Sequence, residues 1–243
     1  MSVNRAKPVN AEKPRRFWEE AGTAAHGDGF AVTLDGRTAR TPGGAPLVLP
    51  TEPAAAIAAE EWAAQGEFLE AASMPATRLA FTAIDAVSAT REPVADEVAR
   101  YAGSDLLCYR EAVEEALARR QADHWQPLLD WAAEELDLPL ICATGIVHQA
   151  QPEGTGELAR VLALRLDDFS LTGLASAVSL FGSAVLGFAL QRGRLDGQGA
   201  FHLSRLDEAW QEERWGVDAE AAERTAAHLR EAEALDRWFR ALG

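Results

Sequence analysis

The residues of this sequence whose spacing most resembles a cofactor site are the glycines of GTGELA, residues 154–159. The run matches a GxGxxA pattern, in which glycines let a pyrophosphate approach the start of a helix. A dinucleotide site also requires a strand before the glycines and a second strand, ending in an acid, about 20 residues later. Here residues 149–153 read as a loop, and the residues after the glycines stay helical. The run therefore predicts a helix start, and we expect no cofactor.

Chemistry that depends on a metal, a phosphate-binding loop or an activated serine has no matching motif. The sequence contains no HExxH, CxxC or GxSxG pattern, and no lysine follows Lys13 to serve a phosphate-binding loop. The acid pairs 134–135 and 167–168 lie on predicted helices, where adjacent side chains point apart and cannot share a proton. We therefore expect no metal site and no catalytic residue. The five histidines are scattered: His26, His124, His148, His202 and His228.

The most informative segment is LSRLDEAWQEERWG, residues 203–216, because it combines acidic and aromatic residues at helical spacing. Leu203, Leu206 and Trp210 mark an apolar face, and Gly216 is a natural helix stop. Periodicity alone favours a helix packed on the core with a solvated charged side. The alternative is a patch that docks a partner protein, since tryptophan is enriched among interface anchors. The candidate partner-binding residues are Asp207, Glu208, Gln211, Glu212 and Trp215.

The charge of the chain excludes further classes of function. Lys+Arg number 23 against 38 Asp+Glu, so the net charge is -15 over 243 residues. Residues 1–50 carry about +2 and residues 51–243 carry -17. Because a surface this acidic repels phosphate backbones, we expect no nucleic-acid partner.

These candidate residues must be positioned by two kinds of element. In residues 16–50 the apolar residues Phe30, Val32 and Leu34 alternate, and Asp35-Gly36 is a hairpin signal, with a return strand over 37–41 and another at 47–49. From Thr51, an N-cap candidate, the pattern turns helical. We predict an α+β fold, with a small N-terminal β domain followed by a larger, mainly helical domain. The predicted divisions are a flexible lead-in at 1–15, the β-rich domain at 16–75 and the helical domain at 76–243.

The predicted helices after residue 111 cover 112–136, 157–168, 170–191, 200–214 and 219–241. The stretch 171–190 carries no charge and is long enough for a membrane span, but its serines and glycines favour the buried central helix of a bundle. Two short apolar runs, 106–109 and 140–143, either pair as strands or serve as buried connectors. We expect no stable membrane insertion and a monomer.

The two cysteines, Cys108 and Cys142, are 34 residues apart. The basic N-terminus has no apolar segment of the kind found in secretory signals. Two reduced, buried thiols in a cytoplasmic protein are therefore favoured over a disulfide.

Taken in order, several motifs resemble a known family, the assembly chaperones of the alpha subunit in the catalytic head of F-type ATP synthase. The resemblance covers roughly residues 16–225 and rests on the order and spacing of the motifs. They are RFW at 16–18, LDGRTARTPGGAPLVLPT at 34–51, AEEWAAQ at 59–65, MPATRLAFTAID at 74–85, YAGSDLLCYR at 101–110 and SRLDEAWQEERWG at 204–216.

The resemblance implies a non-enzymatic protein that binds unassembled alpha subunit, prevents its aggregation and yields it to the beta subunit. It also implies a β domain followed by a helical domain. Acidic residues of the SRLDE-type helix matter in the family, and they match Asp207 and Glu208, while Trp62 matches a tryptophan that is either core or contact. Mitochondrial members carry a presequence, so a bacterial cytoplasmic member is expected. The alternatives are a hydrolase using Asp207, Glu208 or Glu212 with a metal, and an interaction module for another complex.

Overall fold

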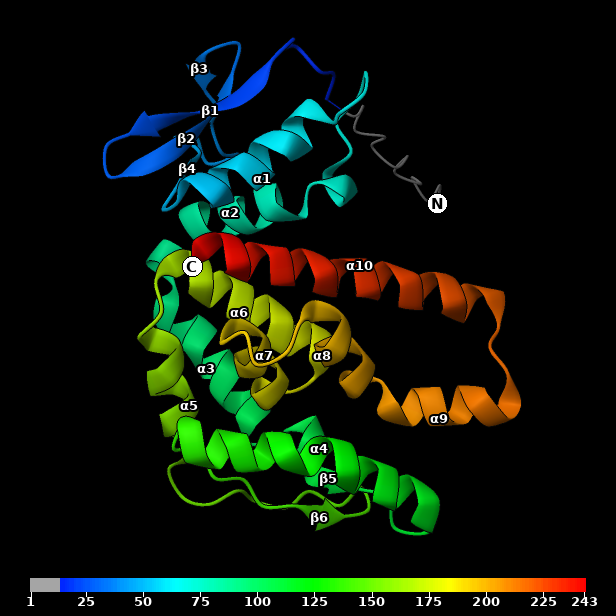
Figure 1. The fold of residues 1–243 in the computed structure, drawn as a ribbon. Helices are drawn as coiled ribbons and strands as arrows, with labels where there is room; N and C mark the ends of the chain where they lie inside the picture. Colours follow the sequence, from blue (N-terminus) through cyan, green and yellow to red (C-terminus); the bar gives the residue numbers. More distant parts are fainter. Residues whose placement is uncertain (1–13) are drawn as a thin grey trace, which may run out of the picture.

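A small sheet lies at one end of the molecule and helices make up the rest, as the predicted α+β class requires (Figure 1). The computed structural model describes residues 14–243. The lead-in predicted for residues 1–15 therefore falls almost wholly outside the described residues. The division between residues 75 and 76 stays a prediction, and one continuous apolar core runs from Trp18 beside the sheet to Trp238 near the C-terminus.

Strand β2 is the centre of the sheet. Strands β1, β3 and β4 each pair with it, and all three pairings are antiparallel. The predicted turn at Asp35-Gly36 is confirmed, because both residues have positive φ (48° and 74°). The return strand is shorter than predicted, since only 37–38 form regular pairs. The strands are β1 Ala21–His26, β2 Gly29–Leu34, β3 Arg37–Thr38 and β4 Val48–Leu49.

Thr51 begins the helical part as predicted, because its Oγ1 accepts a hydrogen bond from the Ala54 amide at 3.2 Å. The run at 154–159 also begins a helix, with Gly154 in the left-handed region before Thr155. The helices are α1 Glu52–Ala63, α2 Pro75–Asp85, α3 Arg91–Ala102, α4 Glu115–Glu135, α5 Thr155–Leu164, α6 Asp168–Phe181, α7 Ala184–Gln191, α8 Gly197–Ser204, α9 Leu206–Trp215 and α10 Ala219–Leu242.

Two of the predicted helices are wrong, because the structure has two shorter helices in place of each. The segment 170–191 breaks at Gly182, whose φ of 66° ends α6, and Ser183 then caps α7 by accepting from the Leu186 amide. The fully buried carboxylate of Asp105 accepts from Ser183 Oγ at 2.7 Å and from the Val185 amide at 3.0 Å, so it fixes the break. The segment 200–214 likewise breaks, at Arg205. Among the described residues, no helix is long and apolar enough to cross a membrane.

The two short apolar runs do pair, as one of the two predicted alternatives. Strands β5 (Tyr109–Arg110) and β6 (Ala143–Thr144) form a two-stranded parallel ladder. Both cysteines are free; Cys108 is buried as predicted, but Cys142 is exposed, so the prediction of two buried thiols is half wrong. Cys142 directly precedes β6, in the connector that follows α4; Figure 1 shows β6 beneath α4.

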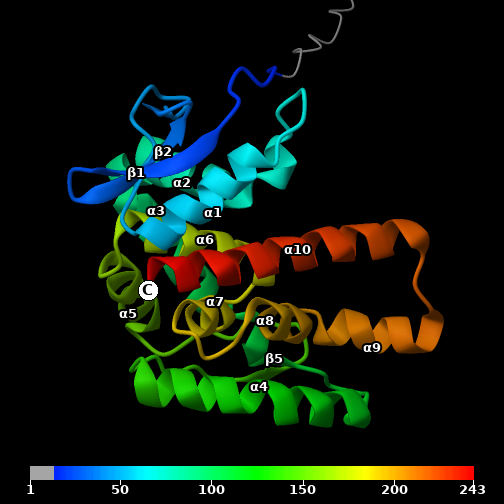
Figure 2. The same ribbon diagram turned by 45° about the horizontal axis from the view of Figure 1, so that its top comes forward.

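Helix α10 joins the parts of the molecule. It runs between α1 and α2 on one side and α6 and α8 on the other, and α1 covers the sheet (Figures 1 and 2). Helix α9 and the first half of α10 reach beyond the body, with α4 alongside α9. We call residues 206–228 the arm.

Candidate functional site

All five predicted partner-binding residues lie on α9, within the arm. The helix begins at Leu206, which is buried and anchors it to the core. It ends at Gly216, which has φ of 83° and donates its amide to the Glu212 carbonyl at 2.9 Å, as the sequence predicted. The acids Asp207 and Glu208 occupy the first turn, where the helix dipole favours negative charge.

Asp207 faces inward and holds α9 on α4. Its Oδ1 accepts a hydrogen bond of 2.8 Å from Nε2 of Gln121, whose side chain is almost fully buried. The Gln121 Oε1 accepts in turn from the Glu111 amide at 2.7 Å. Because a buried amide that loses its partner costs free energy, Asp207 satisfies a group of the core.

Two guanidinium groups lie over the indole of Trp210. The Arg214 and Arg120 Cζ atoms lie 4.2 and 5.7 Å from its ring centroid. Both arginines also bridge to acids, since Arg120 Nη1 lies 2.8 and 2.9 Å from the two Glu213 carboxylate oxygens and Arg214 Nη1 lies 2.8 Å from Glu114 Oε2. Ion pairs and cation–π contacts therefore fasten α9 to the N-terminal half of α4.

Glu212 is also engaged, because its Oε1 lies 2.6 Å from Nη2 of Arg205. The pair joins the residue before α9 to its last turn. Both side chains are only partly exposed. Glu212 therefore belongs with Asp207 among the residues that hold the helix in place.

Three of the five candidates point outward: Glu208, Gln211 and Trp215. Their spacing of three and four residues puts them on one face of α9, which we call the outer stripe. Within the described residues, neither Glu208 nor Gln211 has a side-chain hydrogen bond or ion pair. The indole of Trp215 is 82% exposed, and Val217, just past the helix end, is 53% exposed. An exposed indole beside unpaired polar groups is suited to contact with another protein.

Sequence reasoning missed the residues that dock the helix, namely Arg120, Gln121, Glu213 and Arg214. Their partners lie far apart in the chain, and no local periodicity signals such pairs. Trp62, which the motif left as core or contact, is buried and packs against Trp18 with ring centroids 5.0 Å apart. Among the described residues, no group of three or more His, Cys, Asp or Glu side chains could hold a metal ion.

Known proteins resemble this chain over almost all its length. The structure of Atp12 from Paracoccus denitrificans is 43% identical and matches with a TM-score of 0.88, covering 94% of this chain and 98% of that one. A point mutant of that protein matches equally well. The Atu1473 protein of Agrobacterium tumefaciens is 38% identical, with a TM-score of 0.89 over 95% of this chain and 87% of that one.

A more distant relative is the mitochondrial protein atp12 of Schizosaccharomyces pombe, which is 26% identical over 91% of this chain and 80% of its own length. The family model described as ATP12 chaperone protein matches residues 15–133. This match ends within α4, so it does not include the outer stripe.

The fold, a small sheet followed by a helical body, matches the Atp12 structures, and the family model is one of chaperones. The chain belongs to the ATP12 chaperone family. This confirms the predicted family of ATP synthase assembly chaperones.

Proposed function

We propose that this protein is a non-enzymatic assembly chaperone that binds the unassembled alpha subunit of the ATP synthase and delivers it to the beta subunit. Membership of the ATP12 chaperone family supports this role. An unassembled subunit exposes apolar surface meant for its neighbours, and such surface aggregates. A chaperone that binds the folded subunit stabilises it by mass action and requires no chemistry of its own.

The outer stripe is the proposed contact with the client. The observation that carries this assignment is the division of α9, in which Asp207 and Glu212 are engaged within the protein while Glu208, Gln211 and Trp215 face solvent. An exposed indole can enter an apolar pocket, and Glu208 can pair with a cation of the client. Asp207 and Glu212 then act indirectly, by holding the helix that carries the stripe.

The test is a binding measurement between purified alpha subunit and three forms of this protein: wild type, Glu208→Lys and Glu52→Lys. Glu52 is a matched control, because it is also an exposed acid in the first turn of a helix, on α1. We expect Glu208→Lys to weaken binding roughly tenfold or more, which corresponds to a contact worth about 1.4 kcal/mol. Glu52→Lys is expected to bind as wild type does.

The outcomes separate the site from the function. Equal binding by all three forms contradicts the outer stripe as the contact but leaves the chaperone role. Failure of wild type to bind or to suppress aggregation of the alpha subunit contradicts the role itself. Circular dichroism of each variant shows whether a loss reflects binding or folding.

Delivery to the beta subunit follows if that subunit competes for a surface that overlaps the outer stripe. We therefore expect added beta subunit to release the chaperone, and a stable ternary complex on gel filtration would contradict the overlap.

We also propose that the protein acts as a cytoplasmic monomer, that residues 16–75 and 76–243 are its two domains, and that it has no nucleic-acid partner.

A further inference from the structure

The two cysteines directly precede the first residue pair of the parallel ladder of β5 and β6, and Cys108 ends the 3-10 turn Leu106–Cys108. The register pairs Tyr109 with Ala143, and Cys108 and Cys142 are the residues directly before these two. Neighbouring strands lie about 4.8 Å apart. A disulfide joins residues whose Cα atoms are roughly 4.4–6.8 Å apart. The spacing of the ladder, carried one residue back from its first pair, falls within the range that a disulfide spans.

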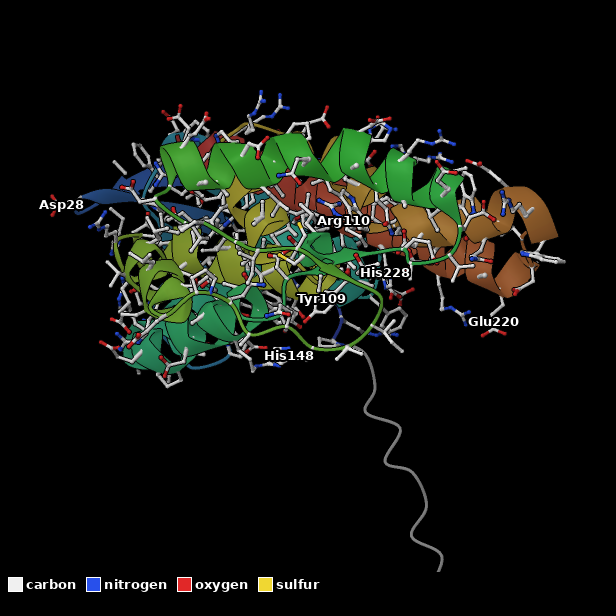
Figure 3. The ribbon with its side chains drawn as sticks, turned by 90° about the horizontal axis from the view of Figure 1, so that it is seen from below. Asp28, Tyr109, Arg110, His148, Glu220 and His228 are labelled. Atoms are coloured by element: carbon white, nitrogen blue, oxygen red, sulfur yellow. The ribbon has the colours of Figure 1, made fainter. Side chains whose placement is uncertain are left out.

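The side chains around the ladder hold it in this register. Gly145 donates its amide to the Arg110 carbonyl at 2.7 Å, and Tyr109 Oη lies 3.2 Å from His148 Nδ1. Figure 3, which shows the protein from below, labels Tyr109, Arg110 and His148 on this side. The Gln151 amide group bonds both the N–H and the carbonyl of Ile141, at 2.9 and 3.0 Å. The Gly145 bond holds the chain after Cys142 on β5, and the Gln151 bonds fix the residue before Cys142.

The two cysteines share neighbouring groups. Arg110 Nη2 donates to Cys142 Sγ at 3.6 Å. Burial raises the pKa of the Cys108 thiol to about 12, and the charges of Asp105 and Cys142 raise it further, while Arg110 and the Gln151 side chain act in the opposite direction. Arg110 is thus a neighbour of both cysteines. Gln151 is a neighbour of Cys108 and bonds the backbone of Ile141, directly before Cys142.

The two thiols differ in access. Cys142 is exposed, whereas Cys108 is only 1% exposed and packs in the core. An oxidant in solution therefore meets Cys142 first, and the Cys108 thiol is close enough for its pKa to respond to Cys142. An exposed sulfur backed by a resolving thiol is the arrangement of a reversible oxidation site.

We propose that Cys142 and Cys108 form a reversible dithiol–disulfide pair, with a peroxide as oxidant and a dithiol as reductant. In the first step the Cys142 sulfur bonds to a peroxide oxygen, the O–O bond breaks and water leaves, so that Cys142 becomes a sulfenic acid. In the second step the Cys108 sulfur bonds to that of Cys142, the S–O bond breaks, and the hydroxide leaves as water with the Cys108 proton. A dithiol returns both residues to thiols by exchange and becomes a disulfide itself.

The bond would join β5 to β6 and close the chain between them, which contains all of α4. Closing such a loop restricts the unfolded chain more than the folded one, where the two residues are already adjacent. Oxidation is therefore expected to raise the unfolding midpoint, and reduction to restore it.

The test treats the folded full-length protein with hydrogen peroxide, blocks remaining thiols with N-ethylmaleimide and measures the intact mass. We expect a loss of two hydrogens with no added maleimide, and a tryptic cross-link between residues 101–110 and 121–160. The midpoint of urea unfolding should rise on oxidation and return after a dithiol is added. Cys142→Ser should show neither change, and Cys108→Ala should stop at the sulfenic acid, which dimedone traps.

Three results overturn the proposal. One is a monomer that carries higher oxides on Cys142 while Cys108 still reacts with maleimide after unfolding. A second is a covalent dimer through Cys142. The third is a cross-link that forms only in urea, which would show that the folded ladder keeps the sulfurs apart. Wild-type protein alone distinguishes these results, so they do not depend on the folding of either variant.

Discussion

At the scale of single residues, α9 shows why a sequence pattern can locate a site without assigning roles within it. Helical spacing correctly placed Leu206 on the buried face and Glu208 on the exposed face. The same spacing could not show that Asp207 bonds to Gln121, because that partner lies 86 residues earlier in the chain. A carboxylate at the edge of a helix face reads as solvated until its tertiary neighbour is known. The distinction between residues that hold the helix and residues that face solvent therefore needed the structure.

Asp207 gives the prediction that belongs to this scale. We expect Asp207→Ala to lower the free energy of unfolding by about 1–3 kcal/mol, because it leaves the buried Gln121 amide without its acceptor. Asp207→Asn should retain most of the stability, since its carbonyl oxygen can still accept. Urea unfolding measures both variants. Glu208→Ala is the control, with a change within about 0.5 kcal/mol; equal losses at 207 and 208 would contradict the division of roles.

At the scale of elements, local chemistry predicted the starts and turns, and tertiary contacts decided the rest. The Asp35-Gly36 turn and the Thr51 cap are short-range features and both are confirmed. The break at Gly182 was missed because the residues on both sides of it are apolar or small, so one long buried helix fits the same pattern. Gly182 ends α6 there, and the start of α7 is fixed by the buried carboxylate of Asp105, 78 residues away from Ser183.

A similar long-range cap starts α2. Its own N-cap position, Met74, offers no side-chain acceptor. The Glu61 carboxylate of α1 instead accepts from the amides of Ala76 and Thr77, both at 2.8 Å. Pro75 suits the first turn of a helix, but nothing near it in the sequence marks the acceptor, since a cap supplied by another helix follows no fixed spacing.

The crossing of α8 and α10 gives the prediction for the element scale. A Cβ atom at Gly197 would lie 2.3 Å from the Ala232 carbonyl oxygen, which belongs to the backbone and cannot turn away. We therefore expect Gly197→Ala to lower stability by roughly 1–3 kcal/mol. Gly156→Ala on α5 is the control, because its nearest contact is an ordinary 3.8 Å and its backbone accepts alanine, so it should gain about 0.4–1 kcal/mol. Chemical denaturation of the two variants checks the contrast, and a neutral Gly197→Ala would contradict the close crossing.

At the scale of the whole molecule, the few basic residues of an acidic chain help to join its elements. The chain from residue 51 onward carries -17, yet several of its arginines are committed to joining elements. Helix α10 ties the two ends of the molecule, since Thr51 Oγ1 donates to the Ala241 carbonyl at 2.6 Å. The arm is held less firmly than α10, because α9 contacts α4 largely through hydrogen bonds and ion pairs between side chains. Segments with few buried apolar contacts open at lower free energy than the core.

The docking of the arm gives the last prediction. Arg120→Ala removes both the bridge to Glu213 and one of the two cations over Trp210, a loss of about 1 kcal/mol. Amide exchange in residues 206–215 should then rise roughly fivefold, while residues 168–191 in the core exchange as before. Hydrogen–deuterium exchange with mass spectrometry resolves the two segments.

Arg119→Ala is the matched control for this loosening, because within residues 14–243 this neighbouring arginine pairs only with Glu115 on its own helix, at 3.7 Å. Its exchange in residues 206–215 should equal that of wild type. If the arm presents the outer stripe to the client, Arg120→Ala should also weaken capture of the alpha subunit although Glu208, Gln211 and Trp215 are unchanged, since a mobile helix must be ordered on binding. A loosened arm with undiminished capture would separate the docking of α9 from client recognition.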